Sequence, residues 1–351
     1  MKIDEIDKNL AVDKTINKEG LKFFSFEEEP FRIYGDLRRE ENGLLYRIPK
    51  DVAERTSKNV TGLAACTAGG RVRFKTNSKR IAIIAKYNLI HQMPHFPITG
   101  SAGLDLYADN KYKATFTPPF SMPNKAYESL AKFADSCERE ITINLPSYSM
   151  LTELYIGIDE GASLSAPTPY KNEKPIVYYG SSITQGACSS RPGATYQSRL
   201  SRWLDWDYIN LGFSGSAYAE EAIIDYIASL DMSVFVCDYD HNAKTLEYLE
   251  ETHMPIYRKI RAKNSELPII FMTRPNSTFS ENRLMRREII KKTYDTAISE
   301  GDKNVYFFDP TECMPLVADD ATVDSCHPTD LGFYFIASAL RPILEKIGKL
   351  S

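Results

Sequence analysis

A short turn rich in glycine and serine, residues 180–186, offers the first chemistry in this chain. It follows residues 174–179, an apolar run that predicts a buried parallel strand. Open α/β sheets place their functional groups at the carboxyl ends of the strands, and Ser182 stands at such an end. A serine hydroxyl becomes a nucleophile only when a base takes its proton and donors stabilise the oxyanion that follows. The sequence must therefore also supply a base and an oxyanion hole.

His327, one of five histidines, is the best candidate for the base. It lies in Asp324-Ser325-Cys326-His327-Pro328, after the last predicted strand and just before the last predicted helix. An aspartate three residues upstream can hold one imidazole nitrogen and leave the other facing a serine. Because this segment ends at the same edge of the sheet as the serine turn, we expect Ser182, His327 and Asp324 to act together.

Two further polar segments follow predicted strands and end at the same edge. Residues 212–216, Gly-Phe-Ser-Gly-Ser, are rich enough in glycine to offer a backbone N–H to an oxyanion. Residues 238–243, Asp-Tyr-Asp-His-Asn-Ala, carry several polar side chains where a buried strand ends. Each segment alone is typical of an ordinary strand-to-helix turn. The ordered set of four segments points to a catalytic site.

These segments depend on a regular alternation of elements beyond residue 170. Short apolar runs predict strands at residues 176–179, 208–211, 234–237, 269–272 and 305–308. Helical patterns fall between and after them, at residues 195–203, 219–228, 245–262, 283–299 and 331–347. Strands that alternate with helices predict a parallel sheet covered on both faces.

The first part of the chain has a different pattern, with short strands and no convincing long helix. The predicted strands are residues 21–26, 71–75 (alternating, with one wet face), 80–87, 103–107, 111–116, 140–145 and 153–158. Residues 108–110, Ala-Asp-Asn, predict a hairpin turn. Residues 161–169 contain small residues and two prolines and predict a linker. We therefore expect a β-sandwich domain at 1–165 and a catalytic α/β domain at 172–351.

The four segments in order, G-x-S-I-T-x-G, N-x-G-x-S-G, an Asn-bearing turn and D-x-x-H, resemble the four blocks of the SGNH (GDSL-type) hydrolases. Residues 103–107, Gly-Leu-Asp-Leu-Tyr, resemble the G-x-D-L-Y signature of a β domain attached to one subgroup of that family. Two positions depart from the family pattern. Ser181 replaces the aspartate of G-D-S, and the third block lacks the usual G-x-N-D.

The resemblance implies a flavodoxin-like three-layer catalytic domain that uses no metal and no cofactor. By position, Ser182 matches the nucleophile, His327 the base and Asp324 its orienting partner. The Ser182 N–H, Gly215 and Asn242 match the donors of the oxyanion hole. In the third block, Asp240 and His241 remain alternatives to Asn242, and Asp240 is also expected to contact the substrate. His91 and His95 do not form a helical zinc pair, because Pro94 and Pro97 exclude a regular helix.

The function expected from these residues is hydrolysis of a short-chain acyl ester of a polar alcohol, in particular a carbohydrate. Two alternatives remain, an acyltransferase with the same triad and a glycan-binding protein with an inactive hydrolase domain. Residues 91–100 form a long, proline-bearing loop directly before the G-x-D-L-Y signature. Clefts between domains are favoured ligand sites, so we expect this loop to wall the cleft, with His95 or Gln92 contacting the alcohol part of the substrate.

The composition and net charge limit the partners and the compartment that we expect for this protein. The 351 residues carry a formal net charge of -4, which gives no general attraction to nucleic acid or to anionic membranes. No apolar run approaches the roughly 18 residues of a membrane span, and the acidic start has no signal core. We therefore expect a cytoplasmic protein, or a secreted one if a signal has been removed. Six cysteines without a C-x-x-C pair predict reduced thiols. A homo-oligomer is compatible with the sequence.

Overall fold

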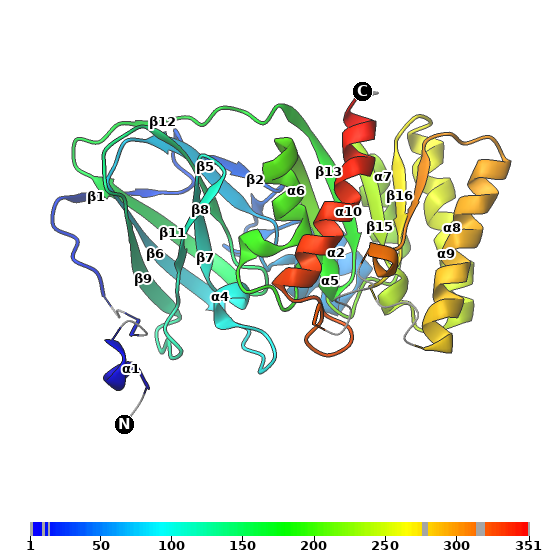
Figure 1. Cartoon of the computed structure of the whole chain (residues 1–351), viewed down its shortest axis with the longest axis horizontal. Coiled ribbons are helices and arrows are strands. Elements are labelled where there is room, and N and C mark those ends of the chain that lie inside the picture. Colours follow the sequence, from blue (N-terminus) through cyan, green and yellow to red (C-terminus); the bar gives the residue numbers. More distant parts are fainter. Residues whose placement is uncertain (1–2, 9–10, 13–14, 276–279, 314–319, 350–351) are drawn as a thin grey trace.

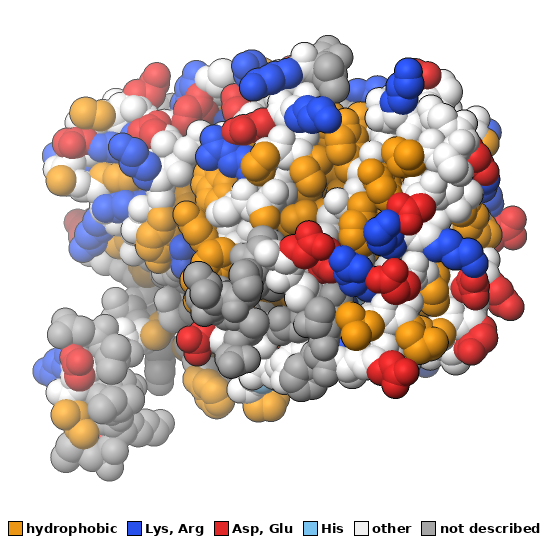
Figure 2. Space-filling view, turned by 45° about the vertical axis from the view of Figure 1, so that its right-hand side comes forward, with side chains coloured by type: hydrophobic (Ala, Val, Ile, Leu, Met, Phe, Trp, Pro, Cys, Tyr) orange, Lys and Arg blue, Asp and Glu red, His pale blue; other side chains and the backbone are white. Residues whose placement is uncertain are grey.

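The computed structural model in Figure 1 describes the whole chain except residues 1–2, 9–10, 13–14, 276–279, 314–319 and 350–351. A β-sandwich lies on the left of the figure and an α/β part on the right. The described chain begins with a short helix, α1 (Ile3–Ile6). No described helix is both long enough and apolar enough to cross a membrane. Figure 2 shows basic and acidic side chains interspersed over one face, with hydrophobic ones between them.

Two antiparallel sheets form the sandwich. The first has the order β1-β11-β6-β9, and its strands are β1 (Leu21–Ser25), β6 (Arg80–Leu89), β9 (Ala126–Lys132) and β11 (Met150–Asp159). The second has the order β12-β5-β10-β7-β8 with β2 beside β5, and its strands are β2 (Arg32–Tyr34), β5 (Arg71–Thr76), β7 (Leu104–Ala108), β8 (Lys111–Phe116), β10 (Arg139–Asn144) and β12 (Leu164–Ser165). A small ribbon pairs β3 (Arg38–Arg39) with β4 (Leu45–Tyr46).

One hydrophobic core joins the two sheets, as alternation along the strands requires. Ile83 and Ile156 of the first sheet pack with Phe74 and Ile143 of the second, all without exposed surface. The predicted hairpin is confirmed, because β7 pairs antiparallel with β8. Asp109 and Asn110 have φ of 49° and 62° in its turn, as a tight hairpin turn needs. The prediction missed β9, and it missed that β12 extends the second sheet within the expected linker.

The α/β part has a five-stranded parallel sheet with the order β14-β13-β15-β16-β17. Its strands are β13 (Asn172–Gly180), β14 (Trp206–Gly212), β15 (Val234–Asp238), β16 (Ile269–Met272) and β17 (Val305–Phe308). Numbered from β13, this is the 2-1-3-4-5 order of flavodoxin-like folds, so the predicted fold class is confirmed. The order reverses between β13 and β15, and such a switch point is where these folds bind ligands.

Helices cover both faces of this sheet. Helices α7 (Glu221–Ser229), α8 (Leu246–Lys263) and α9 (Glu281–Ser299) pack on the face that carries Val177 and Tyr179. Helices α6 (Tyr196–Leu204) and α10 (Asp330–Gly348) pack on the face that carries Ile176 and Tyr178. Successive residues of β13 thus point to opposite layers, which explains its continuous apolar run.

Two features of the junction between the two parts differ from the sequence prediction. Three short helices interrupt the expected all-β region, α2 (Lys50–Thr56), α3 (Lys58–Ala64) and α4 (Ile98–Ser101). The first two pack into the same core as α7–α9, because Val52 and Val60 are buried there. The prediction that one face of β5 is exposed to solvent is also wrong, since Arg71 and Arg73 are only 2% and 6% exposed. Arg71 lies against the ring of Tyr208 at 3.9 Å and pairs with Asp207, both of the α/β part. The boundaries 1–165 and 172–351 stay a prediction.

Candidate active site

The turn after β13 places Ser182 at the start of a four-residue helix, α5 (Ser182–Gln185). The Ser181 side chain caps this helix by accepting the N–H of Ile183 at 3.2 Å. Thr184 donates to the buried carboxylate of Asp238 at 2.7 Å, which anchors the turn to the end of β15. Gly212 permits the close approach of β14, because a Cβ there would lie 2.1 Å from the Gln185 nitrogen. Ser182 is thereby held rigidly and is 5% exposed.

Ser182, His327 and Asp324 form one chain of hydrogen bonds. The Ser182 Oγ lies 2.9 Å from Nε2 of His327, and Nδ1 of His327 lies 2.8 Å from Oδ2 of Asp324. With the Nδ1 proton donated to the carboxylate, Nε2 is free to accept the serine proton. The structure therefore brings together the three residues that the sequence selected.

The loop before α10 fixes the imidazole through a single aspartate. Oδ1 of Asp324 accepts the backbone N–H groups of Cys326 and His327 at 3.1 and 2.8 Å, which closes an Asx-type turn. Its second oxygen is left for the imidazole. Burial acts to raise the pKa of Asp324, but the hydrogen bonds from His327 outweigh it and hold the pKa below its ordinary value. The carboxylate is thus ionised when an imidazolium forms beside it.

Three donors are available near the expected oxyanion. The N–H of Ser182 lies at the N-terminus of α5. Neither this N–H nor that of Gly215 bonds to a described residue. Gly215 has φ +63° and open space where a Cβ would stand. The side-chain oxygen of Asn242 accepts the Ala217 N–H at 3.4 Å, and its side-chain NH2 group donates to no described residue. Their roles as oxyanion donors stay a prediction.

Asp240, which the sequence predicts to contact the substrate, is buried beneath this edge of the sheet. Asp240 lies in the short 3-10 helix Asp240–Asn242 and is completely buried. One of its oxygens accepts the backbone N–H of Arg274 at 3.3 Å. Burial raises the pKa of Asp240 to about 6, against the nearby charge of Arg274. The side chain has no exposed surface, and its contact with a substrate stays a prediction.

The β domain contributes a wall beside Ser182. Tyr148 donates to the Ser182 carbonyl at 3.3 Å, and the ring of Phe96 meets the ring of Tyr148 edge-on at 5.2 Å. The exposed His95 places its ring 5.9 Å from that of His327, so the loop 91–100 lies beside the hydrogen-bonded chain. Gln92 donates to the Phe120 carbonyl at 3.2 Å, at a pocket of about 330 Å³. Substrate contacts of His95 and Gln92 stay predictions.

The G-x-D-L-Y signature clamps the two parts of the chain together at Gly193. Asp105 accepts the N–H of Gly193 at 2.8 Å, and Tyr107 donates to its carbonyl at 3.2 Å. Asp105 also accepts from Asn144 at 2.7 Å. A Cβ at Gly193 would lie 2.5 Å from the ring of Tyr107. The signature thus fixes the segment that follows the serine turn.

Sequence reasoning assigned no role to two further side chains at this edge, Cys326 and Arg274, and considered His241 only as an alternative to Asn242. Nε2 of His241 lies 3.2 Å from Sγ of Cys326, and the His241 ring lies 6.5 Å from that of His327. Burial, with the charge of Arg274 next, lowers the pKa of His241 to about 3, so it is neutral. Arg274 lies two residues beyond the end of the buried strand β16, and that position was the signal that could have found it.

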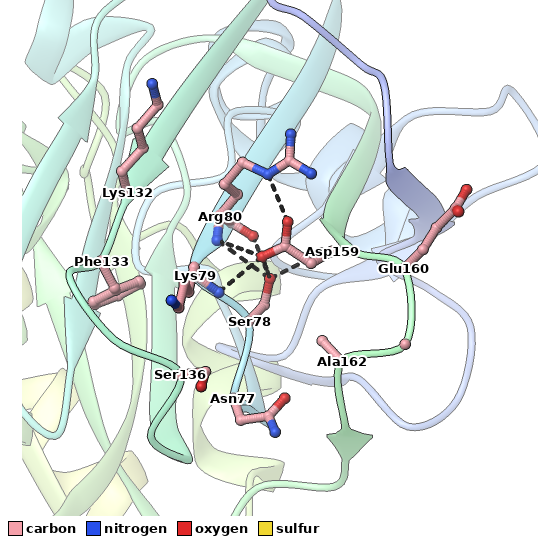
Figure 3. Close-up of a pocket in the computed structure, with 11 residues that line it drawn as sticks. Asn77, Ser78, Lys79, Arg80, Lys132, Phe133, Ser136, Asp159, Glu160 and Ala162 are labelled. Carbon is pink, nitrogen blue, oxygen red and sulfur yellow. Dashed lines mark hydrogen bonds and ion pairs between the residues drawn. The ribbon is translucent and has the colours of Figure 1, made fainter.

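A hollow of about 600 Å³ elsewhere, shown in Figure 3, is a poorer candidate. It lies among β-domain residues, and Asp159 there accepts from Ser78 at 2.9 Å and from Arg80. These polar groups satisfy one another, so none is held ready for a ligand.

Comparison with protein families agrees with this geometry. Residues 173–345 match the GDSL-like Lipase/Acylhydrolase family, and residues 21–164 match the N-terminus of Esterase_SGNH_hydro-type, the GxDLY domain. Together the two matches span most of the chain. The chain belongs to the SGNH (GDSL-type) hydrolases. It is an SGNH-type serine esterase with an N-terminal G-x-D-L-Y domain. No curated protein sequence matches it significantly.

Several solved structures share the whole fold. A protein described as a GDSL-like lipase from Bacteroides ovatus ATCC 8483 is 27% identical, with a TM-score of 0.83 over 94% of this chain and 98% of that one. The salicylyl-acyltransferase SsfX3 from a tetracycline biosynthetic pathway is 19% identical, with a TM-score of 0.76 over 94% and 98%. A family two carbohydrate esterase from Clostridium thermocellum, in complex with cellohexaose, is 13% identical, with a TM-score of 0.62 over 91% and 99%. The last two show the fold alone.

Proposed function

We propose that this SGNH hydrolase cleaves short-chain acyl esters of a carbohydrate or a similar polar alcohol, with Ser182, His327 and Asp324 as its catalytic triad. The single observation that carries the proposal is the hydrogen-bonded chain from Ser182 through His327 to Asp324. It ends at the sheet edge next to the switch point, and donors without acceptors lie in the neighbouring turns.

The reaction follows from the positions of the atoms. Nε2 of His327 takes the proton as Oγ of Ser182 attacks the ester carbonyl carbon. The N–H groups of Ser182 and Gly215 and the amide of Asn242 stabilise the oxyanion. The protonated His327 then gives its proton to the departing alcohol, and an acyl-serine remains. A water molecule, deprotonated by His327, attacks this acyl group and releases the acid.

The wall formed by the loop 91–100 supports the proposal that the alcohol part of the substrate is polar. His95 is exposed and lies beside His327, so the leaving group meets an imidazole there. The carbohydrate esterase with the shared fold adds support for a sugar ester. Transfer of the acyl group to a second alcohol is the other candidate, and the fold shared with the salicylyl-acyltransferase favours it. Both reactions pass through the same acyl-serine.

The test compares Ser182→Ala with Ser189→Ala on esters of increasing chain length and on acetylated sugars. Ser189 donates only to the Gly186 carbonyl, so its removal should leave turnover near that of the wild type. Ser182→Ala should lower kcat by several orders of magnitude without unfolding the protein. Acetate and butyrate esters should be preferred to octanoate, and added alcohols will separate hydrolysis from transfer. A folded Ser182→Ala protein with normal turnover would refute the mechanism.

A further inference from the structure

Thiol and imidazole side chains are concentrated around the Ser182 site. Three of the five histidines and two of the six cysteines of the chain lie there, namely His95, His241, His327, Cys188 and Cys326. The proposed reaction uses only His327, and His95 enters it only as a wall. Soft sulfur and imidazole ligands together are the set that binds zinc in proteins.

Two groups of side chains in this cluster bring three metal-ligand atoms within 4.8 Å of one another. One is His95, Cys188 and His327, and the other is Asp324, Cys326 and His327. A tetrahedral zinc ion would hold such atoms about 3.3–3.6 Å apart, given its usual bond lengths. The first group thus needs a contraction of at most about 1.5 Å, and the exposed side chain of His95 has room to move.

Charge separates the two groups. The Asp324 carboxylate acts on Cys188 and no cation does, whereas the cations Arg274 and Arg283 act on Cys326. A divalent cation is therefore repelled less beside Cys188. The Nδ1 side of His327 already faces Asp324, so a metal would meet Nε2 and displace its hydrogen bond with Ser182. An imidazole with a carboxylate on its far nitrogen is the usual arrangement around a zinc ligand.

We infer that His95, Cys188 and His327 form an inhibitory site for zinc, in which the ion takes the Nε2 lone pair that otherwise accepts the Ser182 proton. Three protein ligands hold the ion and water fills the fourth position. Binding releases the Cys188 thiol proton to solvent, because the thiolate is the ligand. The site opposes the reaction and takes no part in it. Its effect on turnover rests on the proposed function, but its affinity for metal does not.

Zinc binding at this site should depend on pH. Cys188 is 4% exposed, and its thiol must lose a proton to become a ligand. Because one proton leaves for each ion bound, the apparent affinity should rise about tenfold for each pH unit. Magnesium and calcium, which prefer oxygen ligands, should not bind there.

The experiment measures zinc binding and zinc inhibition in the full chain. Wild-type enzyme should bind one zinc ion by calorimetry, lose ester turnover, and be unaffected by magnesium. Cys188→Ser should raise the inhibition constant at least 10–100-fold, the cost of losing even a supporting residue of a metal site. Cys326→Ser and the remote, exposed Cys137→Ser should leave it unchanged. His95→Ala should also weaken inhibition, measured against its own turnover without metal.

Cobalt provides a readout that needs no turnover. Cobalt bound to wild-type protein should show thiolate-to-metal charge-transfer absorption, and Cys188→Ser should lose it while Cys326→Ser retains it. This signal should persist in Ser182→Ala, so a failure of the esterase proposal is distinguishable from a failure of the metal site. Absence of zinc inhibition in the wild type, or inhibition that depends on Cys326 in place of Cys188, would overturn the inference. Circular dichroism of each variant confirms that it is folded.

Discussion

The domain junction and the edge of the parallel sheet both bury charged groups, but only the junction satisfies its two most deeply buried arginines. Arg47 donates to the carbonyls of Cys66, Asn210 and Leu63 at 2.7–2.8 Å. Arg71 reaches Asp207, the Tyr170 hydroxyl and two backbone carbonyls. At the sheet edge, several buried atoms lack any partner, namely Oδ1 of Asp238, Oδ1 of Asp240, Nδ1 of His241 and Nε and Nη2 of Arg274.

This difference separates stability from function. A buried polar atom without a partner costs free energy, so a fold keeps such atoms where another demand outweighs the cost. At the junction Arg47 and Arg71 hold the β domain against the α/β part, and every guanidinium nitrogen of the two is bonded, although Nη1 of the neighbouring Arg73 has no described partner. At the sheet edge, the turns near Ser182 keep buried polar atoms that have no described hydrogen-bond partner. Substitutions at the junction should therefore change stability, and those at the edge should change turnover or the dependence of stability on pH.

The largest effect should come from Arg71→Met. It leaves the half-buried carboxylate of Asp207 and the Tyr170 hydroxyl without their partner, and breaking a buried ion pair in this way costs about 3–5 kcal/mol. Urea unfolding should show this loss, while kcat/KM of the folded protein stays near that of the wild type. Arg32→Met removes an exposed pair with Glu29 and should cost at most about 1 kcal/mol. Equal losses in the two variants would contradict the comparison.

A somewhat smaller effect, seen in turnover and not in stability, is expected for Asn242→Ala. If its amide donates to the oxyanion, kcat should fall about 10²–10³-fold with little change in KM, the cost of one lost donor. The midpoint of unfolding should move little, because the side chain makes only a 3.4 Å bond with the Ala217 N–H. His241→Ala provides the matched control in the same turn. Should His241→Ala show the large loss in kcat instead, the assignment of the third block is wrong.

The sequence predicted the α/β part well because its signals are local. Buried parallel strands read as continuous apolar runs, and β16 and β17 were predicted to the residue. The turns that end on one sheet edge followed from the alternation of strands and helices. The residues of the triad were found for the same reason, since Ser182 follows the end of β13 by two residues and Asp324 and His327 lie in the loop before α10.

Contacts between the two parts could not be predicted in this way. Alternation along β5 correctly separated two faces, but it does not say that Tyr208 and Asp207, over 130 residues away, cover the arginine face. The contact of Tyr148 with the Ser182 carbonyl is likewise non-local and leaves no sequence signal. Asp240 was assigned by polarity alone, which does not distinguish a polar side chain that faces a cleft from one buried beneath it.

The smallest effect concerns Asp240 and appears only as a dependence on pH. Its pKa is raised from 3.8 to about 6, so between these values the folded protein holds a proton that the unfolded chain has lost. Stability therefore falls as pH rises from about 4 to about 6, by up to about 3 kcal/mol at 1.36 kcal/mol per pKa unit. Asn does not titrate, so Asp240→Asn should gain stability relative to the wild type over this window. Urea unfolding at pH 4 and at pH 7 measures the difference.

The same substitution, aspartate to asparagine, should have the opposite effect on stability at Asp159. Its carboxylate accepts from Ser78, from the backbone N–H groups of Lys79 and Arg80 and from the Arg80 guanidinium. Burial acts to raise its pKa, but these bonds outweigh burial and lower it. Its ionised form therefore stabilises the fold, and that contribution is lost as pH falls below the ordinary range. Asp159→Asn should thus lose stability at pH 7 and recover relative to the wild type in acid, where Asp240→Asn has no advantage. Two variants with the same sign would mean that hydrogen-bond satisfaction does not separate the sheet edge from the rest of the molecule.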